Sequence, residues 1–127
     1  FRLPTEAEWE VAARAGVKND YAGGDEIDEL GWHNGNSKEK THEVKKKTPN
    51  AFAIYDMTGN VSEWCYDWYQ DTIGDGGKDP LGPETGEHKV RRGGAFNGFS
   101  GDMYVAMRDK YVPETKIDET GFRLVKR

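Results

Sequence analysis

The sequence predicts a single domain of mixed structure, in which one short helix and a few short strands hold long, coiled loops. Three observations lead to this class. The chain has 127 residues, the usual size of one domain. It contains 16 glycines, and 12% of its residues are aromatic, while its aliphatic content is low. Long ordered loops of this kind usually carry function or a metal.

The helix is predicted to begin near Thr5. Thr5 and Glu8 have the spacing of a capping box, in which a hydroxyl and a carboxylate three residues apart each accept a hydrogen bond from an otherwise unpaired backbone amide. Gly16 is placed to end the helix. The expected apolar face consists of Trp9, Ala12 and Ala13, with Val11 beside them.

The middle of the chain alternates between loops and an apolar stretch. Residues 21–50 carry few apolar side chains, and residues 71–88 are rich in glycine and proline, so both segments are predicted as loops. Residues 54–68, between them, form the richest apolar stretch. The core anchors expected from it are Val61, Trp64, Trp68 and one of Tyr66 and Tyr69.

Short strands are predicted for the last third of the chain. Glycine-rich turns separate the three expected strands, 90–96, 104–107 and 122–125. In the last of them, alternation would turn Phe122 and Leu124 toward the core and leave Arg123 and Lys126 in water.

Charge and cysteine content exclude several classes of function. The chain has 18 basic and 23 acidic residues and a net charge of −5, whereas nucleic-acid binding needs a basic face, so nucleic acid is not an expected partner. Cys65 is the only cysteine, so the chain offers no disulfide, no zinc site of four thiolates and no redox pair. No apolar run approaches the ~20 residues of a membrane span.

The segment DMTGNVSEW, residues 56–64, carries oxygen atoms suited to a hard cation. Asp56 and Glu63 bracket Gly59-Asn60, a pair that favours a tight turn with positive φ, so carboxylates and carbonyls can point at one place. Calcium is held by six to eight such oxygens. Spacing alone leaves the alternative open that Asp56 caps a turn and Glu63 lies on the surface of a strand.

Four segments, in this order, resemble the hallmark segments of the formylglycine-generating enzyme family, also called the sulfatase-modifying factor domain. They are FRLPTEAEWEVAARAG, YDMTGNVSEWCYDWY, RRGGAFNG and GFRLVKR. The resemblance implies an α+β fold with little regular secondary structure, a variant of the C-type lectin-like fold. Residues 1–127 are then expected to be one such domain, its carboxy-terminal portion. Because the chain opens on Phe1, it is interpreted as a fragment or processed product.

The resemblance also implies a structural calcium ion at the turn. Its expected ligands are the side chains of Asp56 and Glu63 and the main-chain carbonyls of Gly59 and Val61. A second calcium site of the family lies in the preceding loop, where the possible ligands are Asn34, Asn36 and Ser37.

Catalytic members of the family oxidise a sulfatase cysteine to formylglycine with oxygen and a copper(I) ion held by two cysteines. The matching stretch here, RGGAFNGFSGDMYVAMR from Arg92 to Arg108, contains neither cysteine, is shorter, and has Ala95 in place of the motif's serine. A soft thiolate pair is what copper(I) prefers, so no copper is expected. Cys65 is expected to be a small buried hydrophobe, and the remaining histidines to be loop residues: His33, His42 and His88.

The sequence therefore favours a non-catalytic binding module, with the formylglycine-generating oxidoreductase as the alternative. In this fold residues 96–103 and 111–120 form the exposed face, and variable proteins of diversity-generating retroelements bind ligands with it. The partner is expected to be a protein or small ligand, and one possible setting is a larger exported or cell-surface precursor. For Phe96 and Tyr104, closure of the core is the favoured interpretation. The candidate ligand-binding residues are Phe96, Asn97, Gly98, Phe99, Ser100, Asp102, Met103 and Tyr104.

Overall fold

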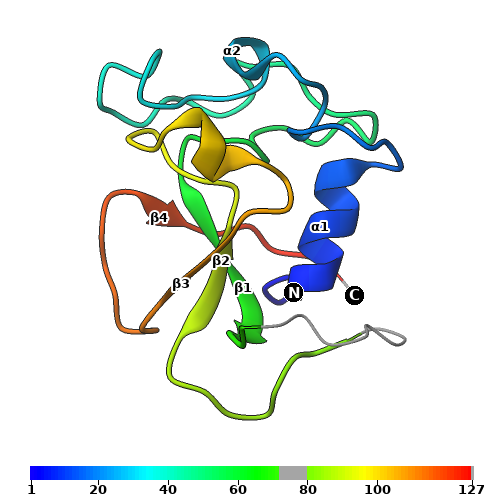
Figure 1. The fold of residues 1–127 in the computed structure, drawn as a ribbon, viewed down its shortest axis with the longest axis vertical. Helices are drawn as coiled ribbons and strands as arrows, with labels where there is room; N and C mark the ends of the chain where they lie inside the picture. Colours follow the sequence, from blue (N-terminus) through cyan, green and yellow to red (C-terminus); the bar gives the residue numbers. More distant parts are fainter. Residues whose placement is uncertain (72–79, 127) are drawn as a thin grey trace.

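A computed structural model describes residues 1–71 and 80–126 of the chain. Residues 72–79 of the predicted loop 71–88 lie outside the described residues. Long loops connect a few short elements, so the predicted α+β class with little regular secondary structure is confirmed (Figure 1). The elements are α1 (Glu6–Arg14), α2 (Ile27–Leu30), β1 (Ser62–Trp68), β2 (Lys89–Arg92), the 3-10 helix η1 (Ser100–Met103), β3 (Arg108–Tyr111) and β4 (Thr120–Gly121).

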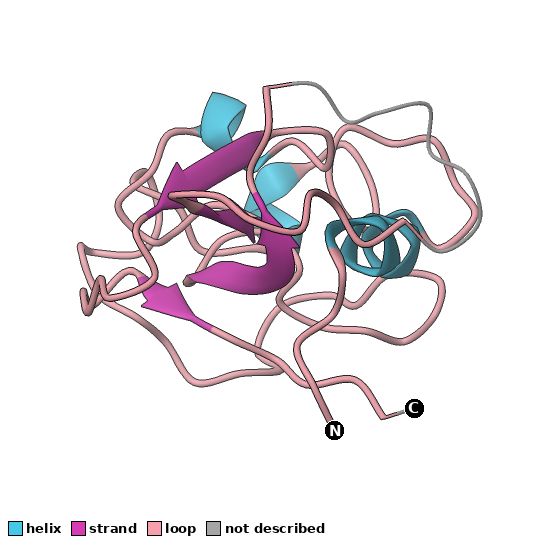
Figure 2. Ribbon diagram, turned by 90° about the horizontal axis from the view of Figure 1, so that it is seen from below, coloured by secondary structure: helices cyan, strands magenta, loops and turns pink. Residues whose placement is uncertain are grey.

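In the described part of the chain the strands form one sheet, in the order β3-β2-β1-β4. The pairs β1–β2 and β2–β3 are antiparallel, and β1–β4 is parallel. Helix α1 lies to one side of this sheet, and the two chain ends lie near each other (Figure 2). An isolated antiparallel bridge between Arg2 and Val125 joins these ends.

The predicted capping box of α1 is confirmed. The Glu8 amide donates to Thr5 Oγ1 at 3.1 Å, and the Thr5 amide donates to Glu8 Oε1 at 2.9 Å. The helix ends where Ala15 and Gly16 adopt positive φ, at 50° and 78°. Val11 is 65% exposed, so the apolar face is narrower than expected.

The core lies between α1 and the sheet, with Cys65 fully buried in it as expected. Side chains alternate across β1, so Cys65 faces Trp9 while Trp64, Tyr66 and Trp68 lie on the opposite face. The prediction that Trp64 and Trp68 anchor the core was therefore wrong, because both are only partly buried. The buried cluster consists of Trp9, Ala13, Ala22, Met57, Cys65, Val90 and Val105, with Tyr69 packed against it.

Buried ion pairs connect α1 to the sheet. The Glu6 carboxylate accepts hydrogen bonds from Arg92 Nη1 at 2.8 Å and from Arg108 Nε at 2.7 Å. The Glu6 amide donates to Asp67 Oδ1 at 2.7 Å. Arg92 also donates to the Val105 carbonyl at 2.5 Å. The opposite charges of Glu6 and the two arginines offset part of the desolvation cost of this cluster, although Arg92 Nε has no partner among the described residues and burial raises the pKa of Asp67.

The predicted strands differ from the observed ones. The strand expected from residue 90 stops at Arg92, because Gly93 and Gly94 adopt positive φ, at 97° and 73°, and turn the chain. Residues 104–107 are not a strand, and β3 begins directly after them. Residues 122–125 are not a strand either, since β4 ends at Gly121.

The orientation expected for the last segment was also wrong. Gly121, the last residue of β4, lies opposite Glu63 in the parallel register with β1, so the chain leaves the sheet beside Glu63. Arg123 is bonded to that carboxylate, whereas Phe122 is 66% and Leu124 52% exposed.

Candidate functional site

The turn at residues 56–60 has the backbone predicted for it. Asp56, Gly59 and Asn60 all adopt positive φ, at 58°, 71° and 69°. A Cβ at Gly59 would lie 2.2 Å from the Trp32 carbonyl oxygen, so a larger residue cannot occupy this position without moving the backbone.

Glu63 is buried and its carboxylate already has three donors from the protein. Arg123 Nε donates to Oε2 at 2.6 Å and Arg123 Nη2 to Oε1 at 2.7 Å, while Trp9 Nε1 donates to Oε2 at 3.1 Å. The same Arg123 Nη2 reaches the main-chain oxygens of Tyr55 and Asp56, each at 3.0 Å. A guanidinium thus brings the Asp56 backbone and the Glu63 side chain together.

The Asp56 side chain has an unsatisfied oxygen. Its Oδ2 accepts a hydrogen bond from the Lys45 amide at 2.9 Å. Its Oδ1 is buried and has no hydrogen-bond partner among the described residues. An unpaired buried carboxylate oxygen is costly, and a cation would satisfy it, so Asp56 fits the calcium role better than Glu63 does. Within the described ranges, no three or more His, Cys, Asp or Glu side chains form a cluster suited to a metal ion.

The candidate ligand-binding residues divide into an exposed and a buried set. Met103 is 1% exposed and packs in a cluster with Tyr21 and Leu30, so its side chain supports the segment from beneath. Phe99 is 70% exposed. Phe96 and Gly98 are partly buried, and the side chains open to solvent are those of Asn97, Phe99, Ser100, Asp102 and Tyr104.

Tyr104 does not close the core as expected. It is 41% exposed, and its ring stacks on Tyr21 with 5.2 Å between centroids. Tyr21 donates from its hydroxyl to the Ser100 carbonyl at 3.3 Å, and burial raises the pKa of Tyr21. Sequence reasoning missed Tyr21, since it sits in a segment predicted only as loop. Its aromatic character among polar neighbours was the available signal.

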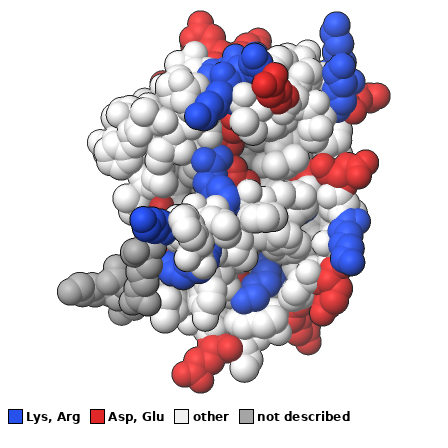
Figure 3. Space-filling model, turned by 180° about the vertical axis from the view of Figure 1, so that it is seen from behind, with Lys and Arg blue, Asp and Glu red and all other residues white. Residues whose placement is uncertain are grey.

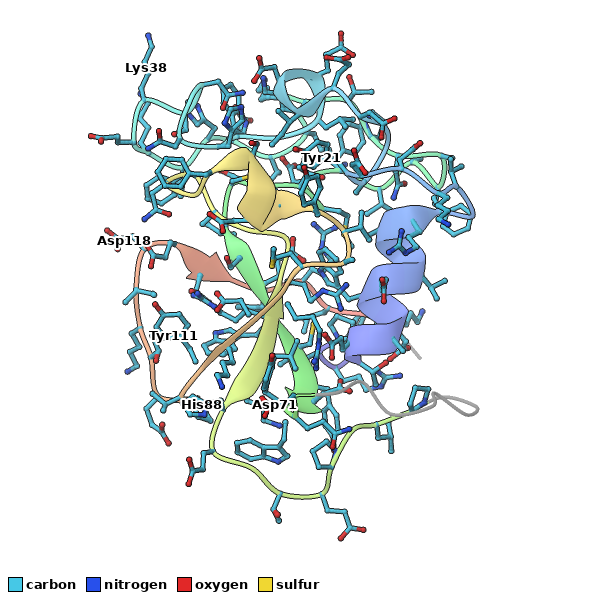
Figure 4. The ribbon with its side chains drawn as sticks, viewed as in Figure 1. Tyr21, Lys38, Asp71, His88, Tyr111 and Asp118 are labelled. Carbon is cyan, nitrogen blue, oxygen red and sulfur yellow. The ribbon has the colours of Figure 1, made fainter. Side chains whose placement is uncertain are left out.

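The exposed segment 96–104 lies against the connection between β3 and β4. Asn97 Nδ2 donates to Glu119 Oε2 at 2.5 Å, which links the two segments side chain to side chain. Tyr111, at the end of β3, and Asp118, in the connection, lie on the side of the molecule away from α1 (Figure 4). The two segments expected to form one face are therefore in contact.

Cys65, His33 and His42, which were not expected to bind a metal, have contacts within the protein. Cys65 is fully buried, and burial raises the pKa of its thiol. His33 Nε2 lies 2.6 Å from Asp28 Oδ1, and His42 Nε2 lies 2.6 Å from the Ser37 carbonyl. The His42 ring stacks on Trp32 with centroids 3.7 Å apart.

Surface charge gives no one-sign face on the side of the molecule that Figure 3 shows. Basic and acidic side chains are interspersed there. This agrees with the slightly acidic composition of the chain, which carries a net charge of −5.

Comparison with known proteins gives the family. The model of the sulfatase-modifying factor enzyme 1-like domain matches residues 1–127. The chain belongs to this family. Its membership confirms the resemblance seen in the hallmark segments and assigns the formylglycine-generating-enzyme type of fold.

Relatives of this sulfatase-modifying factor-like domain carry several names. The chain is 38% identical to the serine/threonine-protein kinase pkn1 of Chlamydia pneumoniae, over 98% of this chain and 21% of that protein. It is 36% identical to the formylglycine-generating enzyme of Thermomonospora curvata, over 96% of this chain and 48% of that protein. The chain therefore spans less than half the length of these two relatives.

Solved structures agree with the family. Treponema denticola variable protein 1 superposes with a TM-score of 0.91 at 42% identity, over 95% of this chain and 45% of that chain. PvdO from Pseudomonas aeruginosa superposes with a TM-score of 0.79 at 30% identity, over 95% of this chain and 50% of that one. Among the described residues, no helix is both long enough and apolar enough to cross a membrane.

Proposed function

We propose that this sulfatase-modifying factor-like domain is a non-catalytic module that binds a protein or a small ligand through residues 96–104 and the adjoining connection 111–120. The observation that carries the proposal is the position of its one cysteine. Copper(I) chemistry of the family type needs a thiolate pair, and the stretch Arg92–Arg108 contains no cysteine. Cys65 is fully buried in the core and its thiol pKa is raised, so it supplies no accessible thiolate.

The composition of the exposed face supports binding. Phe99 and Tyr104 offer aromatic contact area, while Asn97, Ser100 and Asp102 offer hydrogen-bonding groups. Such mixtures are typical of surfaces that adapt to different ligands, because aromatics bring contact area at low entropic cost and short polar side chains adjust their hydrogen bonds. The likeness to a protein named variable protein 1 supports the same class.

The test is selection of peptides from a random display library on the immobilised chain, followed by measurement of affinity. We expect Phe99→Ala to weaken a selected peptide at least tenfold, since a central exposed aromatic is the usual energetic anchor. Leu81→Ala is the matched control, because Leu81 is also an exposed apolar residue, at 59%, outside the proposed surface. Equal loss in both variants, or peptides that bind elsewhere, would contradict the proposal.

The alternative function is the formylglycine-generating oxidoreductase, favoured by the family match and by relatives with that name. Titration with copper(I) in the presence of a cysteine-containing peptide separates the two. If the domain is a binding module, we expect no copper(I) binding with a dissociation constant below about 1 μM and no oxygen-dependent loss of the peptide thiol. Either event would favour the enzyme.

A structural calcium ion is part of the proposal, with Asp56, Gly59, Val61 and Glu63 as its ligands. The buried, unpaired Oδ1 of Asp56 supports it. The ion would neutralise this carboxylate and hold the turn, and at a hundred times its dissociation constant it contributes roughly 2.7 kcal/mol, or roughly 10 °C in Tm.

Asp56→Asn is the sharper variant for the calcium test, because Glu63→Ala also breaks the contacts with Arg123 and Trp9. We expect calcium to raise the Tm of the native chain and not that of Asp56→Asn, while the two have similar Tm values in chelator. A native Tm that is the same in calcium and in chelator contradicts the ion.

A further inference from the structure

The turn at residues 33–37 lies directly against the ligand-binding segment. The Asn34 amide donates to the Gly98 carbonyl at 2.8 Å, and Ser37 Oγ donates to the Phe96 carbonyl at 2.7 Å. We propose that Ser37 is a positioning residue for the ligand-binding segment, acting through the Phe96 backbone without touching the ligand. This positioning role rests on the proposed binding function. The hydrogen bonds themselves are independent of that proposal.

Ser37 is fully buried, at 0% exposure. Water therefore cannot replace its hydrogen bond to the Phe96 carbonyl. The hydroxyl has a single hydrogen, which it gives to Phe96, and its oxygen accepts from the Glu39 amide at 3.1 Å. The family resemblance offers Ser37 as a possible calcium ligand. In the structure its hydroxyl instead joins two loops that lie 59 residues apart in sequence.

The turn that carries Ser37 is held in place by several bonds. The Ser37 amide donates to the His33 carbonyl at 2.9 Å, and the Ser37 carbonyl lies 2.6 Å from His42 Nε2. The Asn36 side chain accepts from the His33 amide at 2.8 Å and donates to the Gly31 carbonyl at 3.0 Å. The Ser37 hydroxyl is therefore fixed before any ligand arrives, which is the condition for preorganisation.

The ligand-binding segment is anchored by its backbone. The Phe96 amide donates to the Asn60 carbonyl at 2.8 Å, and the Gly98 amide donates to the Ala95 carbonyl at 2.9 Å. With the Ser37 bond, both polar backbone groups of Phe96 are held by other loops. The conformation of the segment thus depends on buried residues beneath it, and the exposed side chains of Phe99 and Ser100 are left for contact.

Amide hydrogen exchange tests this role without a ligand. We expect Ser37→Ala to speed exchange of the Phe96, Gly98 and Asn34 amides by about tenfold or more, since loss of one buried hydrogen bond changes local opening by at least that factor. The amide of Trp9, which donates within α1, should keep its rate. Ser62→Ala is the control, because it removes another buried serine hydroxyl, in β1.

A second variant guards against loss of folding in Ser37→Ala. Asn36→Ala removes the side chain that holds the turn and leaves Ser37 in place, so a smaller acceleration at the same amides is expected. Near-ultraviolet circular dichroism checks that each variant is folded. Unchanged exchange at the three amides in both folded variants, or the same acceleration in Ser62→Ala, would overturn the positioning role.

A binding measurement adds the functional arm. For a peptide selected on the native chain, we expect Ser37→Ala to weaken affinity about tenfold, mainly through faster dissociation. If no peptide is selected at the 96–104 surface, the proposed function fails, while the exchange result still decides whether Ser37 holds the backbone of this segment. If exchange accelerates and affinity does not change, the bond is structural and the positioning role is refuted.

Discussion

At the scale of single residues, Arg123 is the residue whose orientation the sequence pattern predicted wrongly. An alternating pattern assigned it to water, because Phe122 and Leu124 are the apolar members of that segment. The structure instead uses Arg123 to neutralise the buried Glu63 carboxylate and to hold two backbone oxygens. A buried carboxylate needs a partner, and this requirement outweighs burial of the two apolar side chains.

Removal of Arg123 should therefore leave a buried, unpaired charge. We predict that Arg123→Ala lowers the free energy of unfolding by about 3 kcal/mol, as expected when one partner of a buried pair is lost. Arg2→Ala is the control, because the Arg2–Glu8 pair is exposed, at 37% and 42% of the side chains, and should cost less than about 1 kcal/mol. Urea denaturation measures both. Similar losses in the two variants would show that Glu63 does not depend on Arg123.

At the scale of elements, the turn and the helix cap show which local features sequence can predict. The capping box of α1 and the positive φ of Gly59-Asn60 depend on neighbours within a few residues, so residue order was sufficient to predict them. The strand boundaries and the core face of β1 depend on pairing with distant segments. In the run SEWCYDW all three aromatic residues share one face and Cys65 lies on the other, so the sequence favours the aromatic face for the core, whereas packing against α1 buries the face of Cys65.

The turn gives a matched pair of glycine substitutions. Gly59 and Gly16 have similar positive φ, 71° and 78°, but a Cβ at Gly59 would lie 2.2 Å from the Trp32 carbonyl oxygen while one at Gly16 meets nothing within 4 Å. We predict that Gly16→Ala costs about 1 kcal/mol, the backbone strain alone. Gly59→Ala should cost several kcal/mol more or prevent folding. Thermal unfolding distinguishes the two variants. Equal Tm values would mean that the Trp32 backbone moves away from the new Cβ at little cost.

The helix cap gives a pH dependence. Hydrogen bonds from Arg2 are the largest cause that holds the pKa of Glu8 down, to about 2, against an ordinary value of 4.5. A depressed folded-state pKa contributes stability that is present above about 4.5 and is lost as pH falls toward about 2. We predict that Glu8→Gln reduces the slope of stability against pH in this window, as measured by urea denaturation at several pH values. Parallel slopes in the native chain and Glu8→Gln would contradict this.

At the scale of the whole molecule, several large apolar side chains of β1 and of the segment after β4 are left in water. Tyr66 is 49%, Phe122 66% and Leu124 52% exposed. Family membership and fold class could be predicted from four ordered segments, since these are spread along the whole chain and resemble the hallmark segments of the family. The exposure of Phe122 and Leu124 could not be predicted, because it depends on the contact of Arg123 with Glu63, which is 60 residues away in the sequence.

This exposure leads to a prediction about solubility. Replacing both Phe122 and Leu124 by Ser should change the free energy of unfolding by less than about 1 kcal/mol, since surface substitutions away from special contacts have small effects. It should also raise the concentration at which the chain stays monomeric, as measured by light scattering. The control Val90→Ala, at a fully buried position, should cost more than either. A large loss of stability in the double variant would indicate that Phe122 and Leu124 point into the core.

The ion pairs of Glu6 also have a consequence for synthesis. Glu6 lies in the first helix, yet its two guanidinium partners follow 86 and 102 positions later. On the ribosome the helix emerges long before either arginine has been translated. Because these partners lie so far along the chain, we expect the Glu6 ion pairs to be complete only after Arg108 has left the ribosome, and the helix to form before it can pack against the sheet.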